Sequence, residues 1–337
     1  MAKPGPVKMW TQYLGARTAA AALTCFDVDW NLRTGGVIGS FAHRMDSRRA
    51  ERSKANIRQS FPEWSEERVE ATAEASMQHL IRFVIETLHT PRLIHEDTWP
   101  ARLEVDKLGE AVAALNSDRP VILVTGHMGN FELLGYALAT MGYPVDALAR
   151  PLDNPLVYDW LLGIRERKGM RVITKWDATD QMVEVLKGGG ALAFIADQNA
   201  GEKQHFVPFM GRLASAYKSI ALLATQFDAT VVCGYALRKG DRFQYEIGTT
   251  DVIYPDDWAD VRDPLYYITA RYARALELAV RRCPEQYWWM HRRWKSRPKH
   301  ERLGKEMPRV LRRNLEDLPW MTESLMRELE KPVETVR

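Results

Sequence analysis

The chain has 337 residues, 46% hydrophobic and 27% charged, which is typical of a globular protein with one large domain or two. Its three cysteines, Cys25, Cys233 and Cys283, are scattered and form no C-x-x-C pair, which argues against a disulfide framework or a zinc site. The net charge is only +3, but residues 281–313 hold twelve Lys and Arg against three Glu, so this stretch is expected to attract phosphate on lipid or nucleic acid.

Residues 1–117 are predicted to form a mostly helical N-terminal region. Residues 14–26 are alanine-rich and mildly apolar, too short and too weakly apolar to span a bilayer. Basic residues follow this segment, so it either lies on a membrane surface or packs as an ordinary helix. These basic residues are Arg44, Arg48, Arg49, Arg52 and Lys54. A longer helix is predicted after Ser65, a typical N-cap residue followed by acidic residues.

Residues 118–298 alternate between strand-like and helical patterns. The strand-like segments read VILVT, MRVIT and ALAFIAD, and helical patterns separate them. The later segments ATVVCGYALR and RFQYEIGT favour a pair of strands. This order predicts an α/β core with a mainly parallel central sheet flanked by helices. Residues 299–337 are predicted to form a basic, peripheral helical tail.

The segment VTGHMGNFELLG, residues 124–135, carries the strongest candidate site. His127 lies on a glycine-flanked turn after a buried strand, Asn130 is a plausible N-cap, and Glu132 falls in the first turn of a helix. Such a turn would bring Glu132 within hydrogen-bond reach of His127, as an orienting group beside a general base. The alternatives are a capping glutamate and a surface histidine.

The loop of residues 196–215 is a second candidate. Asp197 stands at the carboxyl end of a buried strand, and Phe206, Pro208 and Phe209 follow as an apolar lip. An aromatic lip above a carboxylate suits an apolar substrate with a polar head. The alternative is a loop that packs on the core.

Three blocks together resemble a known family: GHMGNFE, ADQNAG followed by FVPFMG, and PEQYWWMHRRWKSRP. In order and spacing, over about residues 10–298, they are similar to the bacterial lipid A biosynthesis acyltransferases, the late-acyltransferase branch of the lysophospholipid acyltransferase-like enzymes. The resemblance implies an enzyme at the cytoplasmic face of the bacterial inner membrane, peripheral or shallowly anchored. It would transfer an acyl chain from acyl carrier protein or acyl-CoA to a hydroxyl of a lipid A precursor or related glycolipid.

The resemblance also implies roles for individual residues. His127 and Glu132 match the family's catalytic pair, in which the histidine takes the acceptor's proton and the hydroxyl attacks the thioester directly, without an acyl-enzyme. Arg165 matches an arginine of the family core and is expected to act in catalysis as an oxyanion donor, a phosphate clamp being the alternative. No metal or cofactor is required. The expected substrate-binding residues are Asn130, Arg150, Asp197, Phe206 and Phe209.

Two other functions remain open from the residues alone. One is acyl transfer to a lysophospholipid or another lipid. The other is non-catalytic binding of anionic lipid or nucleic acid through the basic stretch, although the sequence has no helix-turn-helix, RRM or KH signature. The expected partners are therefore the acyl donor, the lipid acceptor and an anionic membrane surface, without nucleic acid.

Overall fold

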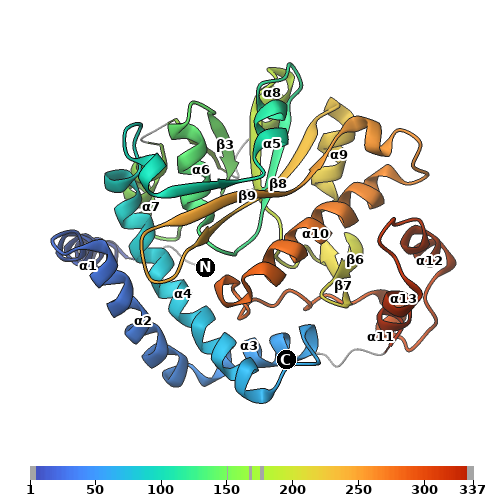
Figure 1. Ribbon diagram of the computed structural model, residues 1–337, viewed down its shortest axis with the longest axis horizontal. Helices are drawn as coiled ribbons and strands as arrows, with labels where there is room; N and C mark the ends of the chain where they lie inside the picture. Colours follow the sequence, from blue (N-terminus) through green and yellow to red (C-terminus); the bar gives the residue numbers. More distant parts are fainter. Residues whose placement is uncertain (1–4, 150, 167–168, 175–177, 332–337) are drawn as a thin grey trace.

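The computed structural model describes residues 5–149, 151–166, 169–174 and 178–331. Within these residues a seven-stranded sheet lies at the centre, flanked by helices, in the order β1-β9-β8-β2-β5-β3-β4 (Figure 1). Helices precede the sheet in the chain and a helical tail follows it. The predicted α/β class, with a helical N-terminal region and a helical C-terminal tail, is confirmed.

The sheet is mainly parallel, as predicted. Strands β8, β2, β5, β3 and β4 run in one direction, whereas β9 is antiparallel to β8 and β1 runs parallel to β9. The expected strand pair is β8 with β9. The bounds are β1 Leu103–Asp106, β2 Val121–Thr125, β3 Val145–Leu148, β4 Arg171–Ile173, β5 Ala191–Ile195, β8 Thr230–Arg238 and β9 Tyr245–Ile253.

The N-terminal helices are α1 (Pro6–Thr24), α2 (Val28–Met45), α3 (Ser47–Ser60) and α4 (Glu66–Leu93). Helices α2 and α4 lie side by side below the sheet in Figure 1. The Ser65 hydroxyl caps α4 by accepting a hydrogen bond from the Arg68 N–H, as the sequence predicts. None of the helices described is long and apolar enough to cross a membrane.

The helices that accompany the sheet are α5 Gly109–Leu115, α6 Phe131–Thr140, α7 Pro155–Arg165, α8 Ala178–Lys187, α9 Lys218–Phe227 and α10 Pro264–Arg282, with short 3-10 turns at Trp99–Ala101, Pro255–Trp258 and Pro284–Gln286. Strand β1 and helix α5 lie inside the predicted helical region of residues 1–117, yet they belong to the sheet and to the layer that covers it. The change from helices to sheet therefore comes earlier in the chain than the sequence pattern suggested.

Alternation along β2 separates the two faces of the sheet. Ile122 and Val124 lie in the main core, which includes residues of α9 and α10. Leu123 and Thr125 are only partly buried and line a cavity with residues of α5 and α6. Successive side chains of a strand point to opposite faces, so the cavity borders mainly the face of Leu123 and Thr125, although Val124 also lines it.

A β-hairpin forms in the segment for which the sequence predicted a loop with an apolar lip. Strands β6 (His205–Phe209) and β7 (Arg212–Ala216) pair antiparallel. The two residues between them, Met210 and Gly211, have φ angles of 52° and 70°. A two-residue turn with both φ angles positive matches the twist of a hairpin. The segment therefore packs as a small sheet rather than as an irregular loop.

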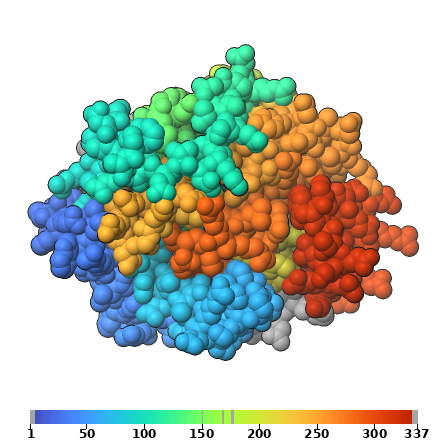
Figure 2. Space-filling model, viewed as in Figure 1, coloured from blue at the N-terminus to red at the C-terminus, as the bar shows by residue number. Residues whose placement is uncertain are grey.

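The tail is less peripheral than expected. It contains α11 (Lys299–Arg302), α12 (Arg309–Glu316) and α13 (Glu323–Leu329). Leu315, Leu318 and Leu329 are buried in the main core, because the apolar residues of α12 and α13 turn inward while the basic ones stay outside. Figure 2 shows the tail, in red, packed against the orange segment that contains α10.

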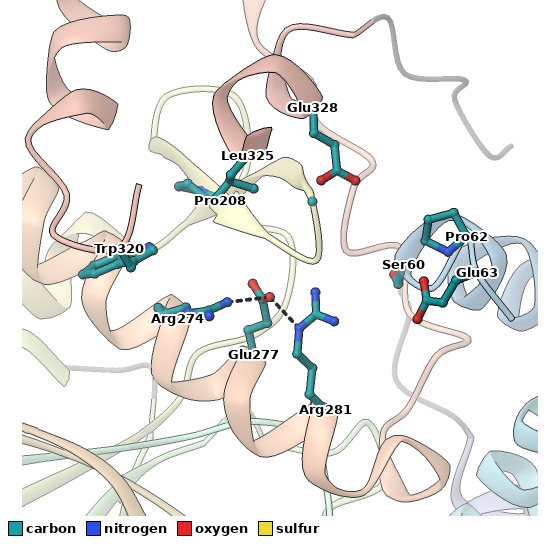
Figure 3. Close-up of a pocket in the computed structure, with 11 residues that line it drawn as sticks. Ser60, Pro62, Glu63, Pro208, Arg274, Glu277, Arg281, Trp320, Leu325 and Glu328 are labelled. Atoms are coloured by element: carbon teal, nitrogen blue, oxygen red, sulfur yellow. Dashed lines mark hydrogen bonds and ion pairs between the residues drawn. The ribbon is translucent and has the colours of Figure 1, made fainter. Parts of the chain in front are cut away.

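A polar cavity of about 250 Å³ lies where the tail, the hairpin, α3 and α10 meet (Figure 3). Glu277 of α10 accepts hydrogen bonds from Arg274 and Arg281, each at 2.8 Å, and from the Met210 N–H at 2.9 Å. Because Glu277 is buried and its oxygens are used in this way, it fastens the hairpin turn to α10. The cavity is a structural junction.

Candidate active site

His127 lies on the turn that joins β2 to α6. Asn130 caps α6 by accepting a hydrogen bond from the Leu133 N–H at 2.8 Å, as predicted. Gly129 has a φ of 51°, and a Cβ there would collide with the carbonyl oxygen of Ala236 on β8. Only glycine fits this position, because a side chain would be strained by both the backbone conformation and the contact.

A distant segment holds the same turn from the other side. The Gly129 N–H donates to the Gln286 carbonyl and the Trp288 N–H donates to the His127 carbonyl, both at 3.0 Å. These bonds bring Trp288 and His291 to the imidazole, with ring centroids 5.2 and 4.8 Å from that of His127. The block PEQYWWMHRRWKSRP therefore forms one wall of the site.

The carboxylate beside the imidazole is that of Asp197. The Nδ1 of His127 lies 2.7 Å from its Oδ1, and Nε2 lies 3.1 Å from the amide nitrogen of Gln198. Burial alone would raise the pKa of Asp197, but attraction to His127 and their hydrogen bond outweigh it and lower the pKa to about 2. A charged carboxylate on Nδ1 fixes the tautomer in which Nε2 is the proton acceptor.

The expected contact between Glu132 and His127 is absent, since Glu132 pairs with Arg165 instead. The Arg165 Nε donates to Glu132 Oε2 at 2.8 Å, and Nη2 pairs with Oε1, which makes a bidentate ion pair. The reason is the direction of α6, which places its first turn beside the end of α7. Both acids named from the sequence, Glu132 and Asp197, lie at the candidate site, but Asp197 rather than Glu132 contacts His127.

Strand register explains why Asp197 meets His127. Thr125 at the end of β2 pairs with Ile195 at the end of β5. His127 and Asp197 each lie two residues beyond these partners, so they leave the sheet at the same level. Two parallel neighbouring strands end at one edge, which is where open α/β sheets place their sites.

A cavity of about 790 Å³ opens beside these residues. His127, Glu132, Arg165, Gln198 and Trp288 line its polar part. The rest is largely apolar, lined by residues such as Leu108, Ala111, Leu115, Leu138, Val232 and Ile247. A large, mainly apolar cavity with a few polar groups suits a long hydrocarbon chain joined to a polar reacting group.

His291 completes a potential ligand set. His127, Asp197 and His291 offer ligand atoms that all lie within 4.8 Å of one another. Burial, with a smaller contribution from the charge of His127, lowers the pKa of His291 to about 4, so this ring is neutral near pH 7. A metal ion held by all three groups would have to displace the short hydrogen bond between His127 and Asp197.

Three residues expected to contact substrate do not reach the cavity. Asn130 is fully buried, and its amide donates to Glu86 at 2.9 Å, so it supports the turn from below. Phe209 is buried against Tyr287 and Trp294, and Phe206 packs on the same core, because the hairpin lies on the core face. Arg150 lies outside the described residues.

Sequence reasoning missed a buried polar network beneath the turn. Glu86 on α4 is fully buried and pairs with Arg238 on β8 at 2.7 Å. His79, two turns earlier on α4, lies 3.0 Å from the Gly129 carbonyl. Two ionisable residues seven positions apart on a buried helix face are a sequence signal from which this network could have been predicted. The network ties α4 and β8 to the turn that carries His127.

Sequence comparison with known proteins gives matches over most of the chain. Residues 6–296 match the family described as bacterial lipid A biosynthesis acyltransferase. A lipid A biosynthesis lauroyltransferase of Escherichia coli is 28% identical over 273 residues, which cover 79% of this chain and 85% of the relative. A palmitoleoyltransferase of the same pathway and organism is 26% identical over 270 residues, covering 77% and 83%. A lipid A biosynthesis acyltransferase of Haemophilus influenzae is 26% identical over 268 residues, covering 77% and 81%.

Proposed function

This chain belongs to the bacterial lipid A biosynthesis acyltransferases and is therefore an acyltransferase, and we propose that it transfers a fatty acyl chain from acyl carrier protein or acyl-CoA to a hydroxyl of a lipid A precursor or a related glycolipid. The observation that carries this proposal is the imidazole of His127, oriented by Asp197, beside an apolar cavity of about 790 Å³. The cavity would hold the acyl chain of the donor, with its thioester near the imidazole.

In the proposed mechanism the acceptor hydroxyl replaces the Gln198 amide at Nε2 of His127. Nε2 takes the proton as the hydroxyl oxygen attacks the thioester carbonyl, and the Asp197 carboxylate stabilises the imidazolium. When the tetrahedral intermediate collapses, the C–S bond breaks and the imidazolium returns the proton to the leaving thiolate. No serine or cysteine of the described segments is hydrogen-bonded to His127, which favours direct transfer over an acyl-enzyme.

Arg165 would stabilise the oxyanion of the intermediate. It shares the cavity lining with His127, and its pair with Glu132 uses Nε and Nη2 but leaves Nη1 available as a donor. Glu132 would then act as a positioning residue that holds the guanidinium in place. The role of Glu132 proposed here differs from the expected one, because Asp197 orients the histidine.

We also place the protein at the cytoplasmic face of the inner membrane as a peripheral protein. Helix α2 exposes apolar side chains at positions that recur along one helical face: Trp30, Val37, Ile38, Phe41 and Met45. An exposed apolar stripe followed by arginines suits an anionic bilayer surface. Leu14 and Phe26, within residues 14–26 where the sequence suggested a membrane-surface segment, are exposed as well.

The test is acyl transfer by the purified protein. Two donors, acyl carrier protein charged with a labelled acyl chain and labelled acyl-CoA, are each incubated with a phosphorylated glycolipid and with a lysophospholipid as the acceptor. We expect transfer to the glycolipid by the wild type, and loss of nearly all transfer in His127→Ala at an unchanged melting temperature. Transfer to the lysophospholipid alone would change the acceptor class. Binding of lipid without any turnover would indicate a non-catalytic lipid-binding protein.

A further inference from the structure

Four arginines gather at the elbow between α2 and α3, and we call Arg48, Arg49, Arg52 and Arg292 the arginine cluster. The three on α3 are spaced i, i+1 and i+4, so they lie on neighbouring positions of one helix face. Burial, and then the charges of Arg292, Arg48 and Arg49, lower the pKa of Arg52, as expected for like charges that lie close together. Such a group of like charges attracts anions.

The nearby carboxylate of Asp46 offsets only part of this charge. Asp46 pairs with Arg49 at 2.8 Å and also caps α3. Arg48 and Arg292 are exposed and form no ion pair with any residue that the structure describes. The Nε of Arg52 is buried without a hydrogen-bond partner among those residues. The cluster therefore keeps several guanidinium donors available.

The cluster is attached to the wall of the active site. Arg52 Nη1 lies 3.4 Å from the Met290 carbonyl. Asn56, one turn along α3, donates to the Trp289 carbonyl at 2.8 Å and to the His291 carbonyl at 3.2 Å. Since the His291 ring contacts that of His127, the cluster lies one short segment away from the catalytic imidazole.

An apolar surface adjoins the same elbow. A shallow cavity of about 380 Å³ is lined by the apolar residues Ala42, Met45 and Met77 and by the polar residues Asp46, Ser47, Arg48 and Arg49. Met45 also ends the exposed apolar stripe of α2. Apolar side chains beside guanidinium groups are what an anionic amphiphile requires, because the hydrocarbon covers the methionines while the arginines bind phosphate bidentately.

We propose that the arginine cluster binds a phosphate group of the lipid acceptor and thereby delivers the acceptor hydroxyl to His127. This inference rests on the proposed acyl transfer. We assign the cluster to the acceptor and not to the acyl donor. The donor's acyl chain would occupy the cavity beside α5 and α6, and no residue of the arginine cluster lines that cavity. A lipid already in the membrane reaches the protein from the side of the α2 stripe, where the elbow lies.

The first test compares wild type with the exposed-site variants Arg48→Gln, Arg292→Gln and their combination. Arg309→Gln on α12 is the matched control, since Arg309 is also exposed but lies far along the chain in the tail. Steady-state kinetics are measured in detergent micelles with a phosphorylated glycolipid and with the same lipid after enzymatic dephosphorylation. We expect the combined variant to raise the acceptor KM about tenfold or more, with kcat within twofold, for the phosphorylated acceptor only.

Each other result overturns the proposal in a specific way. An unchanged acceptor KM removes the cluster from recognition, and an equal loss on the dephosphorylated lipid makes its role structural. A rise in the donor KM instead assigns the cluster to an acidic donor protein. If the variants lose only binding to vesicles of phosphatidylglycerol and phosphatidylcholine, and behave as wild type in micelles, the ligand is the bulk anionic membrane.

A binding measurement separates this inference from the proposed function. Affinity of the protein for the phosphorylated and dephosphorylated glycolipids in micelles needs no turnover. We expect wild type to prefer the phosphorylated lipid and the combined variant to lose that preference. If wild type binds with this preference but transfers no acyl chain, the site survives and the acyl-transfer proposal fails.

Discussion

At the scale of single residues, the environment of the His127 imidazole decides which groups act on a substrate. Nδ1 is occupied by the buried Asp197 carboxylate, whereas Nε2 meets only the side-chain amide of Gln198, which can move. In the proposed mechanism the acceptor hydroxyl would therefore approach at Nε2 and replace the Gln198 amide there.

The proposal that Asp197 orients His127 and that Glu132 instead holds Arg165 can be tested directly. We predict that Asp197→Asn lowers kcat by about 10³-fold or more, because an amide at Nδ1 no longer enforces the tautomer that leaves Nε2 basic. KM for donor and acceptor should change little. Steady-state kinetics on variants with wild-type melting curves give the measurement. A nearly normal kcat in Asp197→Asn would show that Asp197 does not orient the His127 imidazole and would favour Glu132 for that role.

For variants of Arg165 we predict a different kinetic effect. Arg165→Ala should lower kcat on the order of a hundredfold by removing one oxyanion donor. Glu132→Gln should lower kcat by a smaller factor, because the Arg165 guanidinium is then no longer held in place. Acceptor and donor are varied separately. A large rise in acceptor KM with normal kcat would make Arg165 a phosphate clamp, and wild-type values for both would make the pair with Glu132 structural.

At the scale of elements, the β2–α6 turn is held by three different parts of the chain. His79 from α4 bonds the Gly129 carbonyl, β8 approaches the Gly129 backbone, and the 286–288 segment bonds the turn on its other side. A catalytic group must be held to within a fraction of an ångström, and a turn alone is too mobile to do this. The buried polar network supplies that support.

The buried His79 makes the support sensitive to pH. Burial, helped by the charge of Arg238, lowers the pKa of His79 from 6.5 to about 3. Between these values the unfolded chain binds a proton that the folded one does not, so stability falls as the pH falls below 6.5. We predict a loss of about 2 kcal/mol between pH 6.5 and 4.5 from this group.

His79→Gln is the matched variant, since its amide can still donate to the Gly129 carbonyl. Urea unfolding of both proteins across this pH range gives the comparison. The stability difference between wild type and variant should shrink as the pH falls, because only wild type loses the contribution of the neutral imidazole. Two parallel stability curves would show that His79 does not titrate in this way.

At the scale of the whole molecule, the apolar cavity lies beside the sheet and the main core, and the helical N-terminal region carries the exposed stripe. The cavity would hold the acyl chain from the donor, and the stripe would hold the enzyme on the surface that contains the acceptor. The candidate active site lies at the strand ends, where the cavity, α4 and the 286–291 segment meet. Two lipid substrates can then reach His127 by separate routes.

Membrane attachment follows from this arrangement. We predict that replacing both Ile38 and Phe41 by serine weakens binding to anionic vesicles about tenfold or more, since each partly exposed side chain contributes on the order of 1 kcal/mol when it enters the interface. Val310→Ser is the control, because Val310 is 73% exposed but lies on α12. Vesicle sedimentation gives the measurement. Equal binding by wild type and the double variant would place the membrane contact elsewhere.

Local sequence was sufficient wherever a structure depends on neighbours in the chain. The strand of residues 121–125, the Asn130 cap and the helix after Ser65 were predictable, because capping and periodicity act within one turn or one strand. The family resemblance likewise named His127, Glu132, Arg165 and Asp197 as a set. These features needed no knowledge of how distant segments pack.

Which side chains meet was decided only by the tertiary structure. Parallel pairing of β2 with β5 places Asp197 beside His127 across 70 residues of sequence, while the direction of α6 turns Glu132 toward Arg165. The hairpin takes Phe206 and Phe209 to the core face, and the tail buries Leu315 and Leu329. Such contacts depend on strand register and helix packing, which arise between segments far apart in the chain. A periodic pattern records only that a side chain is buried, and it does not name the partner against which it is buried.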